Sequence, residues 1–262
     1  IDVEKALDYA YAERIGVDLD SLAISEPEDG ADALRVASAS LQAGARYVVL
    51  DSVAALTTEA ERADLMAKSM GAQARLMSQG LRNLINDARA ANAVLVLINQ
   101  TRSKIGVVYG SPRTTTGGNA LKFYASERID LTYKGKLEGV GKTQIGVTIQ
   151  GTVVKNKLAP PMQRAQWDIR WGVGIERGAD IVRAGLGCGV LVRSGNAVMF
   201  EDYKVGASFA KACDEMARNA EVADAIEVAC RKAAASAMRG DLRKRPGARI
   251  PPGYNGAGHD ET

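Results

Sequence analysis

Tyr47-Val48-Val49-Leu50 is an apolar run of strand length that ends at Asp51. A second apolar run covers residues 93–98. Runs without polar alternation are typical of parallel strands that are buried on both faces of a sheet. Between these two runs, residues 70–91 carry apolar side chains at helical spacing. The alternation of strand and helix predicts an α/β fold with a mostly parallel, twisted sheet.

Further elements follow from the same periodicities. Before the first strand we expect a short strand over residues 22–25 and a helix over 30–43. After the second strand, residues 101–118 are rich in Gly, Ser and Thr. This stretch is long for a simple connector, which favours a functional loop. Beyond it we expect a helix over residues 119–126. A hairpin should follow, with strands over 128–134 and 144–156, and then a further strand over 166–171.

The pattern changes near Gly172. We expect a helix over 174–184, a hairpin over 189–203 that turns at 194–196, and two Ala-rich helices. From residue 239 onward the chain is rich in Gly, Pro and Arg, a composition typical of disorder. The prediction is therefore a core over 1–172, a small α+β domain over 173–238 and a disordered basic tail over 239–262.

Composition excludes several classes of protein. The 262 residues include three cysteines without CxxC spacing, which argues against a zinc site or a disulfide framework and favours a reducing cytoplasm. The only histidine, His259, lies in the polar tail. No apolar run approaches the roughly 20 residues that span a bilayer, so we expect no membrane partner. Since the chain starts at Ile1 with an organised pattern, we expect it to begin inside a domain.

Polar residues stand where predicted strands end. Asp51 and Gln100 follow the two apolar runs, and Glu4 follows Ile1-Asp2-Val3, which could be the end of a further strand. Ligands of parallel α/β sheets bind at the carboxyl ends of the strands. A carboxylate after an apolar strand is also the arrangement that holds Mg²⁺ near phosphates. Two alternatives stay open: Asp51 could cap a turn, and Glu4 could complement a helix dipole.

The Gly-Lys-Thr tripeptide at residues 141–143 resembles the last part of a phosphate-binding loop motif. That motif requires G-x-x-x-x-G-K-[ST] between a strand and a helix. Here Gly135 is one residue too far away, and both flanks have the pattern of hairpin strands. We therefore expect no phosphate site at this tripeptide.

The loop that begins at Thr101 has the composition of a phosphate-binding surface. Residues 101–122 contain four basic residues and no acidic one: Arg102, Lys104, Arg113 and Lys122. Glycines and hydroxyls ahead of a helix N-terminus suit a nucleic-acid backbone. A flexible solvated loop is the alternative. Lys155 and Lys157 leave one face of a predicted strand, where either an anion or only water and salt could separate their charges.

Several segments, taken together, resemble one protein family. They are residues 1–8, 50–56, 74–79, 98–100 with 104–106, 153–157 and, most specifically, Thr114-Thr115-Thr116-Gly117-Gly118-Asn119-Ala120-Leu121-Lys122-Phe123-Tyr124. In order and approximate spacing they are similar to the RecA family of bacterial and phage homologous recombinases. The resemblance covers roughly residues 1 to 200. It implies a RecA-like P-loop ATPase core with a small α+β C-terminal domain, and ATP and Mg²⁺ as cofactors.

The resemblance implies nucleotide-site roles at individual positions. Glu4 would orient and activate the attacking water, and Asp51, beside Ser52, would hold Mg²⁺ through its water shell. Gln100 would sense the γ-phosphate and couple it to the loop that follows.

Further contacts with nucleotide are implied by the same resemblance. Asp8 and Tyr11 would contact the adenine, Tyr11 by stacking. Lys155 and Lys157 would reach the nucleotide of the neighbouring subunit, as an arginine finger does. Such a site would be complete only in a filament.

Two loops, at about 61–70 and 101–118, would bind DNA according to the resemblance. The implied DNA-binding residues are Met70, Gly71, Arg75, Ser78, Arg82, Arg102, Lys104, Ile105, Thr116, Gly117, Gly118 and Asn119. Ile105 would act as a wedge between base triplets. The first loop is about one residue shorter than is usual in the family and lacks its Gly- and Glu-rich character, which puts its contacts in doubt.

The predicted function is an ATP-dependent helical filament on single-stranded DNA that pairs with double-stranded DNA and exchanges strands in recombination and repair. The family's P-loop would lie upstream of Ile1, so we do not expect the chain alone to hydrolyse ATP. One alternative is a non-catalytic DNA-binding or filament-modulating subunit, which a measurable ATP affinity would contradict. Another is a hexameric helicase or a RadA-like branch-migration factor, against which the segment 114–124 argues.

Overall fold

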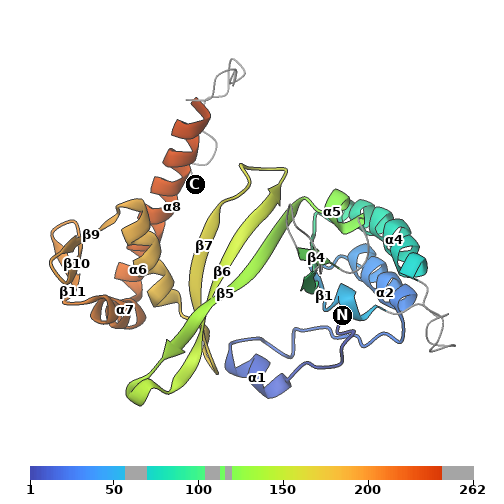
Figure 1. Cartoon of the computed structure of the whole chain (residues 1–262), viewed down its shortest axis with the longest axis horizontal. Helices are drawn as coiled ribbons and strands as arrows, with labels where there is room; N and C mark the ends of the chain where they lie inside the picture. The colour runs from blue at the N-terminus through green and yellow to red at the C-terminus, as the bar shows by residue number, and fades with distance from the viewer. Residues whose placement is uncertain (57–69, 104–112, 116–119, 244–262) are drawn as a thin grey trace. The chain divides into compact units, whose positions relative to one another are not determined.

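The computed structural model describes residues 1–56, 70–103, 113–115 and 120–243 (Figure 1). The chain divides into two compact units. The first unit comprises Ile1–Leu131 and Gly151–Arg164, and the second comprises Thr132–Gln150 and Ala165–Thr262. Within the described residues, no helix has both the length and the apolar character needed to cross a bilayer.

A parallel strand pair forms the centre of the first unit, as predicted. Strand β1 (Tyr47–Leu50) pairs with β2 (Val94–Leu97) in register, with Tyr47 opposite Val94 and Leu50 opposite Leu97. The first residues of the chain extend along β1, because Asp2 and Asp51 form a parallel bridge and the Val3 amide donates to the Asp51 carbonyl at 2.7 Å. Residues 1–3 thus pair with the end of β1 through one isolated bridge and do not form a strand among the described residues.

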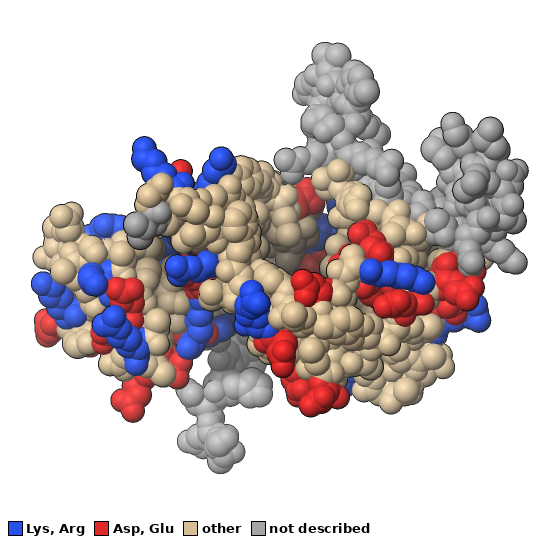
Figure 2. Space-filling view, turned by 90° about the horizontal axis from the view of Figure 1, so that it is seen from below, with Lys and Arg blue, Asp and Glu red and all other residues tan. Residues whose placement is uncertain are grey.

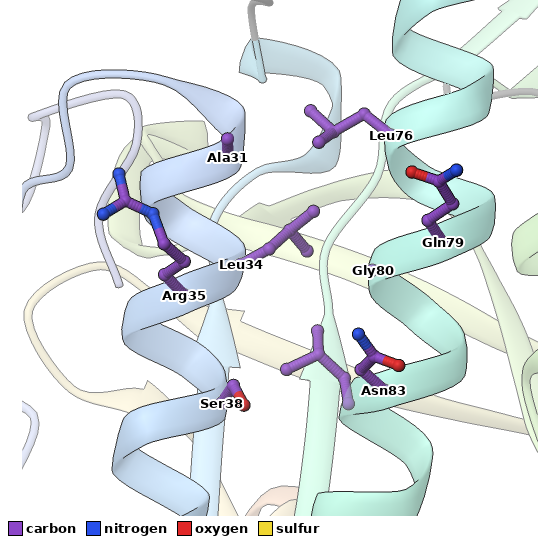
Figure 3. Close-up of a pocket in the computed structure, with 9 residues that line it drawn as sticks. Ala31, Leu34, Arg35, Ser38, Leu76, Gln79, Gly80 and Asn83 are labelled. Atoms are coloured by element: carbon purple, nitrogen blue, oxygen red, sulfur yellow. The ribbon is translucent and has the colours of Figure 1, made fainter.

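Helices α2 (Gly30–Gln42) and α4 (Met70–Ala90) lie side by side in the first unit (Figures 1 and 3). The alternating β1 residues Val48 and Leu50 point into the core, where they pack with buried side chains of both helices, among them Leu41 and Leu84. The opposite face of the strands is exposed: Tyr47 79%, Val49 44%, Val94 50% and Val96 42%. The prediction of strands buried on both faces is therefore met on one face only.

Short elements surround this pair. Helix α1 (Tyr9–Arg14) follows the first segment, the 3-10 helix η1 (Val53–Ala55) follows β1, and α5 (Ala120–Tyr124) precedes the large sheet. The strand predicted over residues 22–25 is not formed. Ser25 instead accepts one isolated backbone hydrogen bond, from the Asp2 amide, and a single bond does not make a ladder.

A four-stranded sheet has the order β5-β6-β7-β8. Its strands are β5 (Glu127–Glu138), β6 (Gln144–Asn156), β7 (Arg164–Arg170) and β8 (Gly174–Ile175). The short turn between β5 and β6 contains η2 (Val140–Lys142) and is closed by the Gly139 amide, which donates to the Thr143 carbonyl at 2.8 Å. The Gly-Lys-Thr tripeptide thus lies in a hairpin, as predicted, and not at a strand-to-helix junction.

Among its described residues, the second unit contains three α-helices and a small antiparallel sheet, besides its part of the four-stranded sheet. Helices α6 (Arg177–Cys188), α7 (Phe209–Arg218) and α8 (Ala220–Arg243) lie next to a sheet of order β11-β10-β9 (Figure 1). The strands are β9 (Leu191–Ser194), β10 (Ala197–Phe200) and β11 (Tyr203–Gly206). One hydrophobic core, which includes Val182, Val198 and Ile226, joins them.

Three features of this unit differ from the sequence prediction. The helix expected from residue 174 begins at Arg177, because Gly172 and Gly174 adopt positive φ and β8 intervenes. The expected hairpin gains β11 as a third strand. Helix α8 continues through Arg243, beyond residue 239 where the tail was expected to begin.

Candidate functional site

A cluster of polar side chains forms where the predicted strand ends meet. The Glu4 Oε1 accepts a hydrogen bond from Ser52 Oγ at 2.5 Å and a longer one from Gln100 Nε2 at 3.4 Å. Ser52 is only 2% exposed, whereas Glu4 and Gln100 reach solvent. Parallel strands end at one edge of a sheet, and this brings together residues separated by as many as 96 positions.

Asp51 adds a second carboxylate to the cluster. Burial, followed by the charges of Glu4 and Asp2, raises the pKa of Asp51 above its usual value. The charges of Glu4 and Asp2 thus disfavour the ionised form of Asp51, and a bound cation would favour it. Carboxylate oxygens suit Mg²⁺, but the described residues include no group of three acidic, His or Cys side chains that could hold a metal ion together.

The turn that carries Glu4 is held by Asp2. The Asp2 Oδ2 accepts from the Ala6 and Leu7 amides, both at 2.9 Å. Lys5, within this turn, has a φ of 53°. Asp2 therefore both positions Glu4 and contributes charge next to Asp51, a role that we did not predict. The signal in the sequence was a carboxylate two residues before Glu4.

Asp8 and Tyr11, the predicted adenine contacts, lie at the start of α1. Asp8 is the N-cap of this helix, and its Oδ1 accepts from the Tyr11 amide at 2.9 Å. The Tyr11 side chain is partly buried, and Asp8 is exposed. The cap satisfies one free N–H of the helix and fixes the position of both residues relative to each other.

Lys155 contacts the end of helix α5. Its Nζ donates to the carbonyls of Lys122 at 2.6 Å and Phe123 at 2.9 Å, which is a favourable place for a cation because helix C-termini carry free carbonyls. Burial, then Lys157 and Arg128, lower the pKa of Lys155. The Lys157 amide donates to Ser126 just beyond α5, at 3.0 Å. The two lysines therefore border the end of α5 in this structure.

Helix α4 carries the predicted DNA-binding residues that follow the first predicted DNA loop. Arg75 and Arg82 are exposed and seven residues apart, so they leave the same side of the helix. The Arg82 Nε lies 3.5 Å from the Tyr124 Oη, and this hydrogen bond raises the pKa of Arg82. Ser78 is partly buried between them. Met70 and Gly71 form the first turn of α4.

The second predicted DNA loop begins and ends in a two-stranded ribbon. Strand β3 (Thr101–Ser103) pairs antiparallel with β4 (Arg113–Thr115), with Arg102 opposite Thr114. Gln100 directly precedes β3. The remaining predicted residues of this loop lie outside the described residues: Lys104, Ile105, Thr116, Gly117, Gly118 and Asn119.

A groove of about 280 Å³ lies between α2 and α4, on the helical side of the first unit (Figure 3). Leu34, Leu76 and Leu84 line it together with Gln79 and Asn83. The helices approach closely because Gly80 lacks a side chain: a Cβ there would lie 2.5 Å from the Leu34 Cδ1. Among the described residues, none of the predicted site residues lines this groove.

Residues 1–176 match the family described as "RecA N-terminal domain". The chain belongs to the RecA family. Proteins named "Protein RecA" are similar over most of the chain: 42% identity in Caulobacter sp. strain K31, covering 88% of this chain and 65% of the relative. The protein of Methylococcus capsulatus is 44% identical, over 89% of this chain and 68% of the relative. The protein of Haemophilus ducreyi is 44% identical, over 87% of this chain and 61% of the relative. The chain thus spans about two thirds of the length of its RecA relatives.

A solved structure titled "Crystal structure of the RadB recombinase" is also similar, with a TM-score of 0.46 and 20% identity, covering 66% of this chain and 75% of that chain. The RecA family membership supports the parallel α/β core described above as the fold of this chain.

Proposed function

We propose that the chain is the larger part of an ATP-dependent DNA recombinase, which assembles as a helical filament on single-stranded DNA and pairs it with double-stranded DNA. The observation that carries the proposal is the Glu4–Ser52–Gln100 cluster at the carboxyl edge of the sheet, in a chain of the RecA family. Recombination and repair of DNA in the cytoplasm would be its setting, in agreement with three free thiols.

In the nucleotide site, Asp51 would hold Mg²⁺ through the ion's water shell, and Ser52 would lie beside it. The cation would neutralise phosphate charge. Glu4 would accept a proton from the attacking water through its carboxylate, which the Ser52 hydroxyl orients at 2.5 Å. Asp8 and Tyr11 would contact the adenine.

Gln100 would couple the nucleotide to DNA. Its amide donates only a long hydrogen bond to Glu4, 3.4 Å, and long hydrogen bonds are weak. A γ-phosphate is a stronger acceptor because it is charged. Since Gln100 leads directly into β3, a shift of its side chain toward phosphate would move the base of the β3–β4 ribbon.

Lys155 and Lys157 would complete the nucleotide site of the neighbouring subunit. Lys155 already donates to the last carbonyls of α5, the helix that follows the second DNA loop. Transfer of its ammonium to a phosphate would release the end of α5. In this way nucleotide and DNA loop would be linked through one lysine.

DNA would lie along α4 and the β3–β4 ribbon. Arg75, Arg82, Arg102 and Lys104 would meet phosphates, and Ile105 would contact bases. The face in Figure 2 carries side chains of both signs, and the net charge of the whole chain is only +3. Binding would therefore depend on local contacts.

Fluorescence anisotropy with a labelled single-stranded oligonucleotide tests the DNA assignment. Arg102→Ala with Lys104→Ala should weaken binding and lower the slope of log affinity against log salt by about 0.7 for each lost contact with single-stranded DNA. Arg89→Ala is a control for the loss of positive charge, because Arg89 is an exposed arginine of α4 that is not among the residues proposed to meet DNA. Equal effects of the double variant and the control would contradict the assignment.

The water-activating role of Glu4 requires a form of the protein in which a P-loop precedes Ile1. There, Glu4→Gln should reduce ATP turnover by at least about a hundredfold, the range of a lost general base. ATP binding and filament assembly should persist, since Gln can still accept from Ser52. Electron microscopy of the variant with ATP and single-stranded DNA checks assembly; loss of filaments would mean that Glu4 is structural.

A further inference from the structure

The small domain of the second unit, α6–α8 with β9–β11, is attached to strands β6 and β7 through polar side chains. Among the described residues, every buried member of its hydrophobic core belongs to α6–α8 or β9–β11, and none belongs to β6 or β7. Apolar burial therefore stabilises the small domain itself. The attachment of this domain to the two strands depends on contacts outside that core.

Asp168 on β7 is the centre of this attachment. Its side chain is only 4% exposed. Thr148 on β6 donates to its Oδ1 at 2.7 Å, and Arg183 on α6 donates to its Oδ2 at 2.5 Å. A carboxylate this deeply buried requires such partners, because an unpaired charge in the interior is very unfavourable. Asp168 thus accepts one hydrogen bond from a strand and one from the small domain.

Arg183 is held within the small domain by a second contact. Its guanidinium carbon lies 5.8 Å from the centre of the Phe209 ring, at the start of α7, a favourable position for a cation. The side chain is 32% exposed, and its buried Nη1 has no hydrogen-bond partner in the described part of the chain. The pair with Asp168 therefore lacks the two-nitrogen geometry that makes arginine–carboxylate pairs most stable. Separation of the small domain from β7 would break the contact with Asp168 and keep the contact with Phe209.

The connection from β7 to α6 contains two glycines in left-handed conformations. Gly172 has a φ of 74° and Gly174 a φ of 85°, a region that glycine enters without steric cost. Val173 and Ile175 in the same connection are more than half exposed, 53% and 57%. Strand β8, the ladder at this point, is two residues long. Little packing therefore resists a change of direction in this connection.

We propose that Thr148, Asp168 and Arg183 form a latch that holds the small domain against β6 and β7, with the connection at Gly172–Gly174 as its hinge. Opening of the latch breaks the Asp168–Arg183 pair, exposes both charges to water and lets the small domain turn about the two glycines. Thr148 keeps its hydrogen bond to Asp168 in both states, because both residues lie on the strands. The latch thus sets whether the small domain moves with these strands or independently of them.

A second ion pair lies next to the hinge and differs from the latch. Arg170 and Glu176 pair at 2.7 Å, and their side chains are 46% and 28% exposed. Ion pairs that reach solvent contribute little to stability, because water and salt screen them. The buried carboxylate of Asp168 is therefore the group whose pairing determines whether the small domain stays attached.

Hydrogen–deuterium exchange of the full chain tests the latch, measured in peptides that cover residues 171–176. The amides of Val173 and Glu176 in this segment donate to carbonyls of β7, so opening of the hinge exposes them to exchange. Arg183→Leu should accelerate this exchange at least about tenfold, because it leaves the buried Asp168 charge without its cation. Exchange in β10 and α8, inside the core of the small domain, should remain unchanged.

Arg177→Leu is the matched control, because Arg177 lies on the same helix and its ion pairs with Asp224 and Glu227 stay within the small domain. It should leave the exchange of residues 171–176 unchanged. Arg183→Lys, which keeps a cation opposite Asp168, should retain slow exchange. Asp168→Asn removes the buried charge and keeps an acceptor, so it should accelerate exchange less than Arg183→Leu does and serves as the milder variant.

Unchanged exchange of residues 171–176 in both Arg183→Leu and Asp168→Asn would overturn the proposal. Equal acceleration throughout the small domain would also overturn it, because the pair would then stabilise the domain as a whole without a hinge. The result is independent of the recombinase assignment, since neither DNA nor nucleotide takes part in the measurement.

Discussion

At the scale of single residues, the cluster at the strand ends contains carboxylates that repel one another, Glu4 and Asp51, and hydrogen-bond donors, Ser52 and Gln100. Ser52 and Gln100 donate to Glu4, but burial and the neighbouring carboxylates raise the pKa of Asp51. Such an arrangement disfavours the ionised state of Asp51 in the folded chain. Sites that bind cations commonly sacrifice stability in this way.

The variant Asp51→Asn should be at least as stable as the original chain at pH 7. A carboxyl group whose pKa is higher in the folded state makes folding less favourable as pH rises from its unfolded pKa through its folded pKa. The difference should be at most about 1 kcal/mol, because Asp51 is largely exposed and its charge is screened. This difference in stability should disappear at pH values below the pKa that Asp51 has in the unfolded chain.

Urea unfolding at pH 3 and pH 7 measures this difference. Added Mg²⁺ should stabilise the original chain and not the variant, since bound ligand stabilises the folded state. Ser21→Ala, which removes a hydroxyl near an unrelated carboxylate, Asp18, serves as a control for the effect of Mg²⁺. A variant that is much less stable at pH 7 would show that Asp51 is structural.

At the scale of elements, close helix packing depends on small side chains at particular positions. Gly80 allows α4 to approach Leu34 on α2, as Figure 3 shows. In α6, Gly185 does the same for Leu191. Gly187, in contrast, has no atom within 4 Å of the place where a Cβ would lie. The same residue type is therefore required by packing at two of these positions and not at the third.

Gly80→Ala and Gly187→Ala should have different effects. Replacement of a helical glycine by alanine contributes about 0.5–1 kcal/mol of stability when the space is free, and this is the expectation for Gly187. At Gly80 the new methyl group would overlap Leu34, and overpacking costs about 1–3 kcal/mol. Thermal unfolding of both variants checks the prediction; equal stabilisation would show that Leu34 moves freely into the groove.

At the scale of the whole molecule, each unit has its own hydrophobic core. The first unit contains two buried clusters around Leu50, Leu81 and Leu84, and the second contains one around Val182 and Ile226. Chains with separate cores commonly depart from two-state unfolding. The RecA family match covers residues 1–176, which include the first unit and part of the second.

Calorimetry of the chain should therefore resolve two unfolding transitions. Gly80→Ala should shift only the transition of the first unit, and Gly187→Ala only that of the second, because substitutions at distant independent sites act separately. A single transition that both variants shift would mean that the two units unfold as one.

The sequence predicted most elements because their signals are local. The apolar runs that became β1 and β2, and the hairpin that excludes the Gly-Lys-Thr tripeptide from phosphate binding, depend on residues close in the chain. Boundaries were less certain: Gly172 and Gly174 could not reveal by themselves that they would take positive φ and delay α6.

The sequence alone determined the order of the strands and helices, and the presence of Glu4, Asp51 and Gln100 at strand ends, since periodicity and composition encode both. Only the tertiary structure decided that Lys155 borders the end of α5 and that Ser52 and Gln100 donate to Glu4. These contacts join residues 32 or more positions apart, and they arise from helix packing and sheet register. No local pattern contains that information, because side chains distant in sequence become neighbours only after the chain has folded.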